Sequence, residues 1–143
     1  MALDAIRTLG RFYITAALLF IMTLYVDGFV IPIKKRNVAA YRRMAQGAVK
    51  LWKKYGVLEF RECVGDDLKV RQGMGLGFKK MAKLKPDETV MFSWVTFKSK
   101  KHRDQFNAKI MKDPRVANMM KDKKMPFDMK RMSYGGFRVI VDA

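Results

Sequence analysis

Apolar and polar residues alternate in some segments of the chain and recur with helical spacing in others. Residues 23–32 and 57–64 alternate and are rich in β-branched and aromatic side chains, which predicts two strands. Residues 36–55, between them, carry an apolar residue at every third or fourth position. That spacing predicts an amphipathic helix that ends at Gly56. We expect Pro32 to close the first strand, because proline cannot donate a backbone hydrogen bond.

The second half of the chain predicts a third strand followed by two helices. Residues 89–97 are rich in β-branched and aromatic side chains, as expected for a strand. A helix over residues 100–112 follows, with Ser99 as its N-cap and its end before Pro114. A short helix is expected over residues 115–121.

The remaining segments predict a final strand and a long connection. Residues 132–141 are expected to form a strand with a bulge at residues 135–136, where two glycines stand together. Residues 68–88 contain spaced glycines and many lysines, which indicates a long loop with an edge strand at residues 69–71. The order β-α-β-β-α-β is that of an α+β ferredoxin-like domain with a four-stranded antiparallel sheet.

The third predicted strand is apolar on both faces. One face carries Val90, Phe92 and Trp94, and the other carries Met91, Val95 and Phe97. A sheet covered by helices on one side only would leave its second face polar, so a second layer is expected here. Two sheets packed face to face in a homodimer would supply that layer. The alternative is a monomer in which residues 68–88 or the N-terminal segment cover the face.

Composition adds a strongly basic charge to this picture. The chain of 143 residues has 30 Lys and Arg against 13 acids, for a net charge of +17, and the cations gather in residues 79–85, 98–103 and 121–131. Such a field could attract nucleic acid, weakly and without sequence preference, or an anionic membrane surface, although solvated lysine-rich helix faces are the simpler explanation. One histidine and one cysteine exclude an intrachain disulfide and a zinc site with nitrogen and sulfur ligands.

The first 22 residues stand apart from the pattern of the domain. Residues 12–22 form an apolar run behind Arg7 and Arg11, shorter than the ~20 residues of a spanning helix. Because a strand is expected directly after the run, we interpret residues 1–22 as an extension outside the fold and residues 23–143 as one cytoplasmic domain. The alternative is a membrane anchor or export signal at residues 12–22; a membrane partner is otherwise not expected.

Four short blocks carry a resemblance to a known family. They are YVDGF at residues 25–29, ECVGDD at 62–67, FSW at 92–94 and MPFDMKRMSYGGF at 125–137. In order and spacing they resemble the YbaA-like family of small bacterial proteins, over about residues 23–143. The resemblance implies a dimeric α/β-barrel of ferredoxin-like topology and no established activity. Related dimeric α/β-barrels include cofactor-independent oxygenases and isomerases, an analogy at the level of fold alone.

Two carboxylates stand in apolar rows of the predicted strands. Glu62 alternates with apolar residues of the second strand, and Asp27 does so in the first. A buried carboxylate must find a donor or have its pKa raised, and a raised pKa suits a general acid or base. Pairing of either acid with Arg131 or with the Tyr134 hydroxyl is the structural alternative.

Other residues complete the candidate site. His102 lies early in its predicted helix, in line with the apolar face, and is a candidate catalytic partner. Candidate ligand-binding residues are Trp94, Arg103, Asn107, Arg131 and Tyr134, with an arginine holding an anion. We expect a small organic ligand, no cofactor and no metal, and the residues do not decide between an enzyme and a binding protein.

Overall fold

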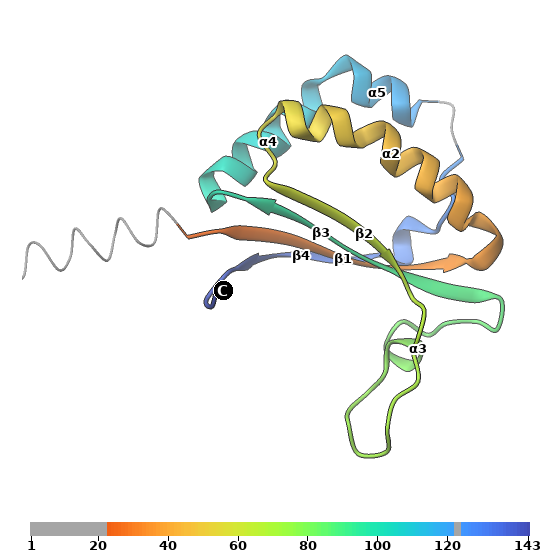
Figure 1. Ribbon diagram of the computed structural model, residues 1–143. Coiled ribbons are helices and arrows are strands. Elements are labelled where there is room, and N and C mark those ends of the chain that lie inside the picture. Colours follow the sequence, from red (N-terminus) through yellow and green to blue (C-terminus); the bar gives the residue numbers. More distant parts are fainter. Residues whose placement is uncertain (1–22, 122–123) are drawn as a thin grey trace, which may run out of the picture.

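The computed structural model describes residues 23–121 and 124–143, which form a sheet covered on one face by helices (Figure 1). The strands are β1 (Tyr25–Lys34), β2 (Glu59–Val64), β3 (Glu88–Phe97) and β4 (Ser133–Arg138). Every pairing is antiparallel and the strand order is β2-β3-β1-β4. This order confirms the predicted α+β ferredoxin-like sheet.

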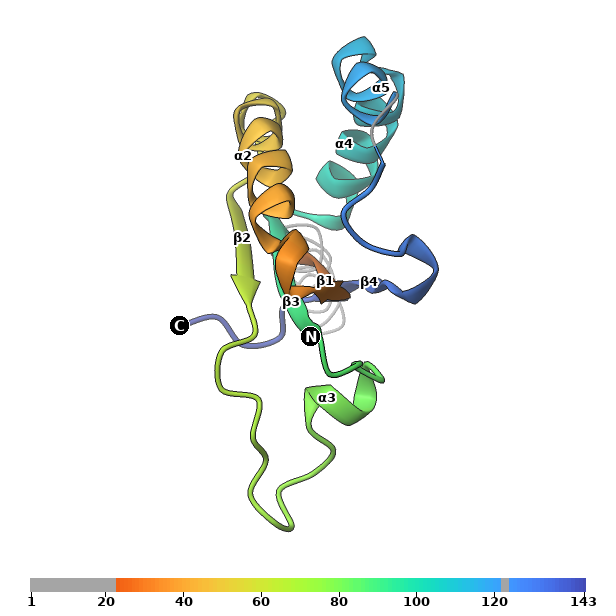
Figure 2. The same cartoon turned by 90° about the vertical axis from the view of Figure 1, so that its right-hand side faces the viewer.

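The helical layer consists of α2 (Val38–Lys54), α4 (Lys100–Lys112) and α5 (Pro114–Met120), which lie on the same side of the sheet in both views (Figures 1 and 2). Their ends follow local chemistry. Gly56, with φ +82°, follows the end of α2, because glycine adopts the left-handed region without a steric penalty. The Ser99 hydroxyl accepts a hydrogen bond from the backbone N–H of His102 at 3.1 Å and caps α4, as predicted.

The sequence suggested that Pro32 closes the first strand, and this prediction is wrong. Pro32 lies inside β1 opposite Val90, and β1 continues to Lys34. The carbonyl of Val90 accepts from the backbone N–H of Gly65, on the side of β2, so Val90 points its backbone groups away from Pro32. The nitrogen of Pro32 therefore faces the side of β4, whose pairing with β1 has already ended at Val30. Proline is tolerated here because that side is an edge.

The predicted bulge at Gly135 and Gly136 is also wrong. The pairing of β4 with β1 is continuous, with Gly135 opposite Gly28 and Gly136 opposite Asp27. Small size is what the position requires: a Cβ on Gly136 would lie 2.5 Å from the Tyr25 hydroxyl. The glycine therefore lets the tyrosine side chain lie across β4.

Residues 65–87 form a long excursion away from the sheet, on the side opposite the helices (Figures 1 and 2). The edge strand predicted at residues 69–71 does not form; the excursion instead contains one helical turn, α3 (Phe78–Met81). Gly73 and Gly75 have φ values of +80° and +98°, so the tip turns where only glycine is free of strain. The ring of Phe78 contacts that of Phe92, at a centroid distance of 6.0 Å.

The strand register separates two apolar faces, as predicted. Met91, Val95 and Phe97 of β3 are buried under the helices. On the other face Phe92 remains 45% exposed and Phe137, on β4, 60% exposed. Neither the excursion nor any other described residue covers this second face fully. No helix in the described ranges is long and apolar enough to cross a membrane, and the run at residues 12–22 lies outside them.

Candidate functional site

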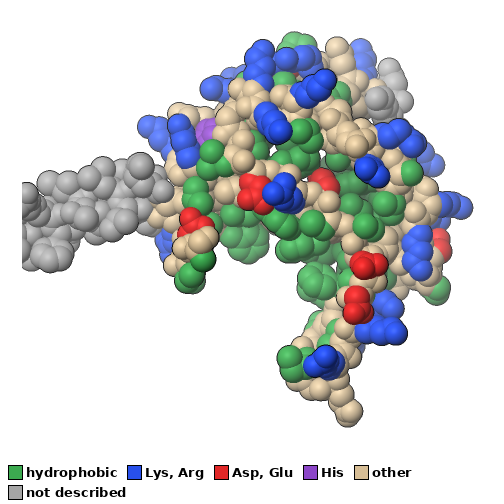
Figure 3. Space-filling view, in the orientation of Figure 1, with side chains coloured by type: hydrophobic (Ala, Val, Ile, Leu, Met, Phe, Trp, Pro, Cys, Tyr) green, Lys and Arg blue, Asp and Glu red, His purple; other side chains and the backbone are tan. Residues whose placement is uncertain are grey.

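A pocket of about 350 Å³ lies between the helical layer and the sheet. Its wall combines residues of β1, β2 and β3 with residues of α2, α4 and α5 and of the segment before β4. Most wall residues are apolar, including Phe29, Phe60, Phe97, Phe106 and Trp52. Figure 3 shows apolar side chains gathered between the helices and the sheet, with Lys and Arg dispersed around the outer surface. Concave, mostly apolar sites with a few polar groups are typical of small-molecule binding.

Glu62 is the first polar group of this pocket. It lies opposite Ser93 in the sheet, so its side chain points toward the helices, as its alternation predicted. The Tyr41 hydroxyl, from α2, donates a hydrogen bond to Oε2 of Glu62 at 2.8 Å. Burial raises the pKa of Glu62, and hydrogen bonds from Tyr41 and Ser93 oppose that rise. Burial, with the charge of Glu62, also raises the pKa of Tyr41. The pair is thus a hydrogen-bonded acid and phenol in apolar surroundings.

Asp27, on β1, is the second carboxylate of the pocket wall and is only 5% exposed. Nη1 of Arg103 lies 3.2 Å from its Oδ1, yet the geometry makes no hydrogen bond, and that oxygen has no hydrogen-bond partner among the described residues. Burial raises the pKa of Asp27, and the charge of Arg103 opposes the rise. Both acids thus have a partner, but neither partner is Arg131 or Tyr134 as the sequence had suggested: Glu62 bonds to Tyr41, and Asp27 forms an ion pair with Arg103.

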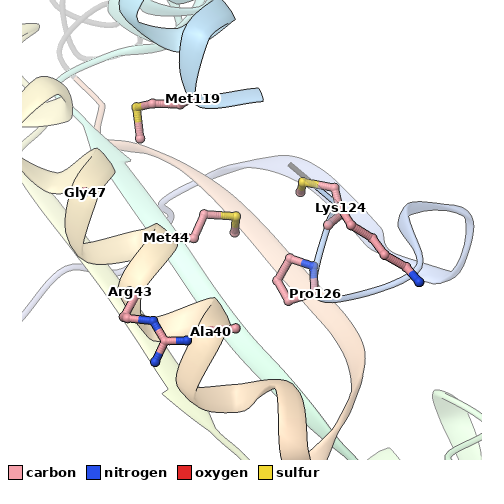
Figure 4. Close-up of a pocket in the computed structure, with 8 residues that line it drawn as sticks. Ala40, Arg43, Met44, Gly47, Met119, Lys124 and Pro126 are labelled. Atoms are coloured by element: carbon pink, nitrogen blue, oxygen red, sulfur yellow. The ribbon is translucent and has the colours of Figure 1, made fainter. Parts of the chain in front are cut away.

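The pocket opens toward a recess between α2 and α5, drawn in Figure 4. The two share Met44, Met119 and Met125. Met44 and Met119 point into the space between their helices (Figure 4). Flexible thioethers at this opening can rotate to admit a ligand without movement of the backbone. A further recess outside β2 is lined by Tyr41, Glu62 and Arg42, so Glu62 is reached from two sides.

His102 does not join the two carboxylates. Its Nε2 lies 3.0 Å from the backbone carbonyl of Tyr55, at the end of α2, and its ring packs edge-on against Phe97. A carbonyl oxygen only accepts, so Nε2 carries the proton and donates this hydrogen bond. The residue tilts toward the sheet, as predicted, but it is absent from the pocket wall. It fixes the end of α2 onto α4.

Three other candidates also lie away from the pocket. Trp94 points to the uncovered face of the sheet, where its Nε1 donates to Oε1 of Glu59 at 3.0 Å. Tyr134 is 66% exposed and stacks on Phe29, at a centroid distance of 5.7 Å. Arg131 forms a two-pronged ion pair with Glu88. None of the three lines the pocket that contains Glu62.

Of the candidate ligand-binding residues, Asn107 alone is part of the pocket wall, and Arg103 touches it through Asp27. Sequence reasoning missed Tyr41, Ser93 and the methionines of the opening. The sequence could have indicated Tyr41, because its hydroxyl group lies on the apolar face of the predicted helix and needs a buried partner. In the described part of the chain no group of three His, Cys, Asp or Glu side chains could hold a metal ion.

Comparisons with known proteins identify the family. The model of a family described as "Protein of unknown function (DUF1428)" matches residues 24–129. The uncharacterized protein YbaA of Escherichia coli K12 is 43% identical over 118 residues, which covers 82% of this chain and 97% of YbaA. YbaA of Shigella flexneri gives the same values. The chain belongs to the DUF1428 family. This confirms the YbaA-like resemblance of the four sequence blocks.

Two solved structures show a more distant likeness in fold. A putative antibiotic biosynthesis monooxygenase from Bacillus cereus gives a TM-score of 0.48 at 10% identity, over 85% of this chain and 97% of that one. The de novo designed protein Foldit4 gives 0.38 at 10% identity, over 80% and 96%. Likenesses at these scores carry no argument about activity.

Proposed function

We propose that this protein binds a small, largely apolar organic molecule in the pocket between sheet and helices, with Glu62 as a proton acceptor. The observation that carries the proposal is a half-buried carboxylate, held by the Tyr41 hydroxyl at 2.8 Å, in the wall of an apolar pocket of about 350 Å³. A pKa raised by burial suits a group that takes a proton near neutral pH.

The chemistry open to such a site is proton transfer, as in cofactor-independent oxygenases and isomerases. Glu62 would take a proton from a bound molecule, and Tyr41 would hold the carboxyl group in place through its hydrogen bond. Asn107, in the same wall, offers an amide to a polar group of the ligand. A binding protein without catalytic activity would use the same pocket, but Glu62 would then only accept a hydrogen bond and would not remove the proton.

The test compares ligand capture by two variants of α2. Ala48 lines the pocket, whereas Ala39 lies on the exposed side of the same helix. Ala48→Phe should fill the pocket and Ala39→Phe should leave it open. We expect native mass spectrometry to detect a retained small molecule, or naphthalene added as a probe, on the wild type and on Ala39→Phe but not on Ala48→Phe. Equal capture by both variants, or none by the wild type, would refute the proposal.

We further propose that two copies pair through the uncovered face of the sheet. Val26, Val30, Phe92, Trp94 and Phe137 share this face, by the strand register. Exposed apolar patches of this kind mark interfaces, and pairing of identical faces by a two-fold axis covers both at once. We propose a cytoplasmic location for the dimer, because a chain with one cysteine forms no intrachain disulfide that would need an oxidising compartment.

Nucleic-acid binding remains the alternative function and has less support. The cations of residues 79–85 lie at α3, whereas Lys121 and Lys124 lie beyond α5, on the opposite side of the sheet (Figures 1 and 2). These clusters do not form one stripe along which a phosphate backbone could run. The +17 charge alone supports weak binding, which would fall steeply with salt.

A further inference from the structure

The wall of the pocket has a charge opposite to that of the protein as a whole. Its two carboxyl side chains are those of Asp27 and Glu62, and no Lys, Arg or His is among the described residues that line it. The chain as a whole carries +17. A ligand that enters therefore moves from a positively charged protein surface into an apolar space that contains two carboxyl groups.

The arginine nearest to the pocket is already engaged. Nη1 of Arg103 lies 3.2 Å from Asp27, its Nε lies 2.9 Å from Asp104, and its Nη2 donates to the Tyr25 hydroxyl at 3.3 Å. The guanidinium also lies 4.9 Å from the centre of the Tyr25 ring. Nε makes no hydrogen bond, but the carboxylates of Asp27 and Asp104 already balance the charge of Arg103, which makes it a poor partner for the anion that the sequence suggested.

The side-chain polar groups of the wall are the two carboxylates, the Tyr41 and Ser93 hydroxyls that bond to Glu62, the Trp52 indole and the Asn107 amide, so its charged groups are all acceptors. Oδ1 of Asp27 is buried and lies 3.2 Å from Nη1 of Arg103, an ion pair that supplies charge but no hydrogen bond, so this oxygen can still accept a hydrogen bond from a donor. Glu62 accepts from Tyr41 on Oε2 and has Ser93 as a second hydrogen-bond partner, and a carboxylate, with about four acceptor sites, can take a further donor. An organic anion brings only acceptors and would lose its water beside two carboxyl groups.

We propose that the pocket takes neutral or cationic apolar molecules that carry an N–H or O–H donor, such as aromatic amines and phenols, and rejects organic anions. This inference rests on the proposed function, because it names the ligand class of the same pocket. The cations near the site line its neighbouring recesses, Arg42 the one outside β2 and Arg43 and Lys124 the one between α2 and α5, and none of the three lines the pocket wall itself. The size of the pocket suits a bicyclic aromatic body.

The test uses four naphthalene probes that share one apolar body: 1-naphthylmethylamine, 2-naphthol, naphthalene and 2-naphthoate. Calorimetric titration of the full chain at pH 7.5 and 0.15 M salt should give binding of the amine and the naphthol at least tenfold tighter than that of naphthoate. Long-range attraction to a protein of charge +17 would favour naphthoate, so the expected order runs against the net field.

Variants locate the selectivity. Glu62→Gln and Asp27→Asn should each reduce the preference for the amine over naphthalene about tenfold, and Asp66→Asn, an exposed loop acid, should leave it unchanged. Naphthalene bound within twofold of the wild type shows that a variant is folded. If naphthalene binds but the affinity for naphthoate equals or exceeds that for the amine, the ligand class is overturned and the proposed function stands. Binding of none of the four probes would overturn both.

Discussion

The ion pair between Glu88 and Arg131 should make the fold sensitive to acid. Nη1 and Nη2 of Arg131 donate to the two carboxylate oxygens of Glu88 at 2.6 and 3.0 Å, and the backbone N–H of Lys85 donates to the same carboxylate at 2.8 Å. These bonds, chiefly those from Arg131, lower the pKa of Glu88 from its ordinary value of 4.5 to about 2. Nη2 also donates to the backbone carbonyl of Lys83 at 3.1 Å.

The sign of the effect follows from linkage. A carboxyl whose pKa is lower in the folded state contributes stability above its ordinary pKa, and that stability is lost as the pH falls through 4.5 toward 2. The shift corresponds to about 3 kcal/mol at most. Solvent reaches Arg131, which is 28% exposed, and screening lowers our expectation to about 2 kcal/mol. In a domain of this size that is a melting-temperature change of about 6–10 °C.

Melting curves of wild type and Glu88→Gln between pH 7 and pH 2 provide the assay. The variant should be about 2 kcal/mol less stable at pH 7, and the two curves should converge at the acidic end. Asp87→Asn is the matched control, since Asp87 is 59% exposed and lies 4.0 Å from Lys34, a pair of little weight. Parallel pH profiles for wild type and Glu88→Gln would refute the reasoning.

Two further predictions concern β4 and the uncovered face. Gly136→Ala should cost about 1–3 kcal/mol, because its Cβ would lie 2.5 Å from the Tyr25 hydroxyl, whereas Gly47→Ala, with Met119 3.6 Å away, should be neutral or stabilising in the same thermal melts. Trp94→Ala should cost about 3–5 kcal/mol and weaken self-association if the sheets pair, and about 1 kcal/mol if they do not. Sedimentation that shows a folded wild-type monomer at micromolar concentration would contradict the dimer.

The elements could be predicted from the sequence because their signals are local. Alternation located the strands, Ser99 and Gly56 marked helix ends, and the register confirms the face assigned to Glu62. Pro32 misled the prediction because its tolerance depends on where β4 begins, at Ser133, some 100 residues later in the chain. The paired glycines of β4 misled it for a similar reason: their neighbour is Tyr25, on another strand.

Partners within the site could not be predicted in the same way. The bond between Tyr41 and Glu62 joins α2 to β2, and the contact between Asp27 and Arg103 joins the first strand to α4. Such pairings depend on how helices cross the sheet, which alternation does not encode. His102 shows the limit most clearly, since its place on the inner side of α4 was expected, whereas its partner is a backbone carbonyl at the end of α2.

The methionines of the pocket should allow the proposed site to accept ligands of more varied shape than its acids alone would. Met44, Met119, Met120, Met125 and Met132 all contribute to its wall. An unbranched thioether changes rotamer at little cost, so the same backbone can fit ligands of different outline. A ligand bound as we propose would have to order several of these side chains, which weakens its affinity. The expected behaviour is a tolerant site, selective for the position of a hydrogen-bond donor and indifferent to the contour of the hydrocarbon that carries it.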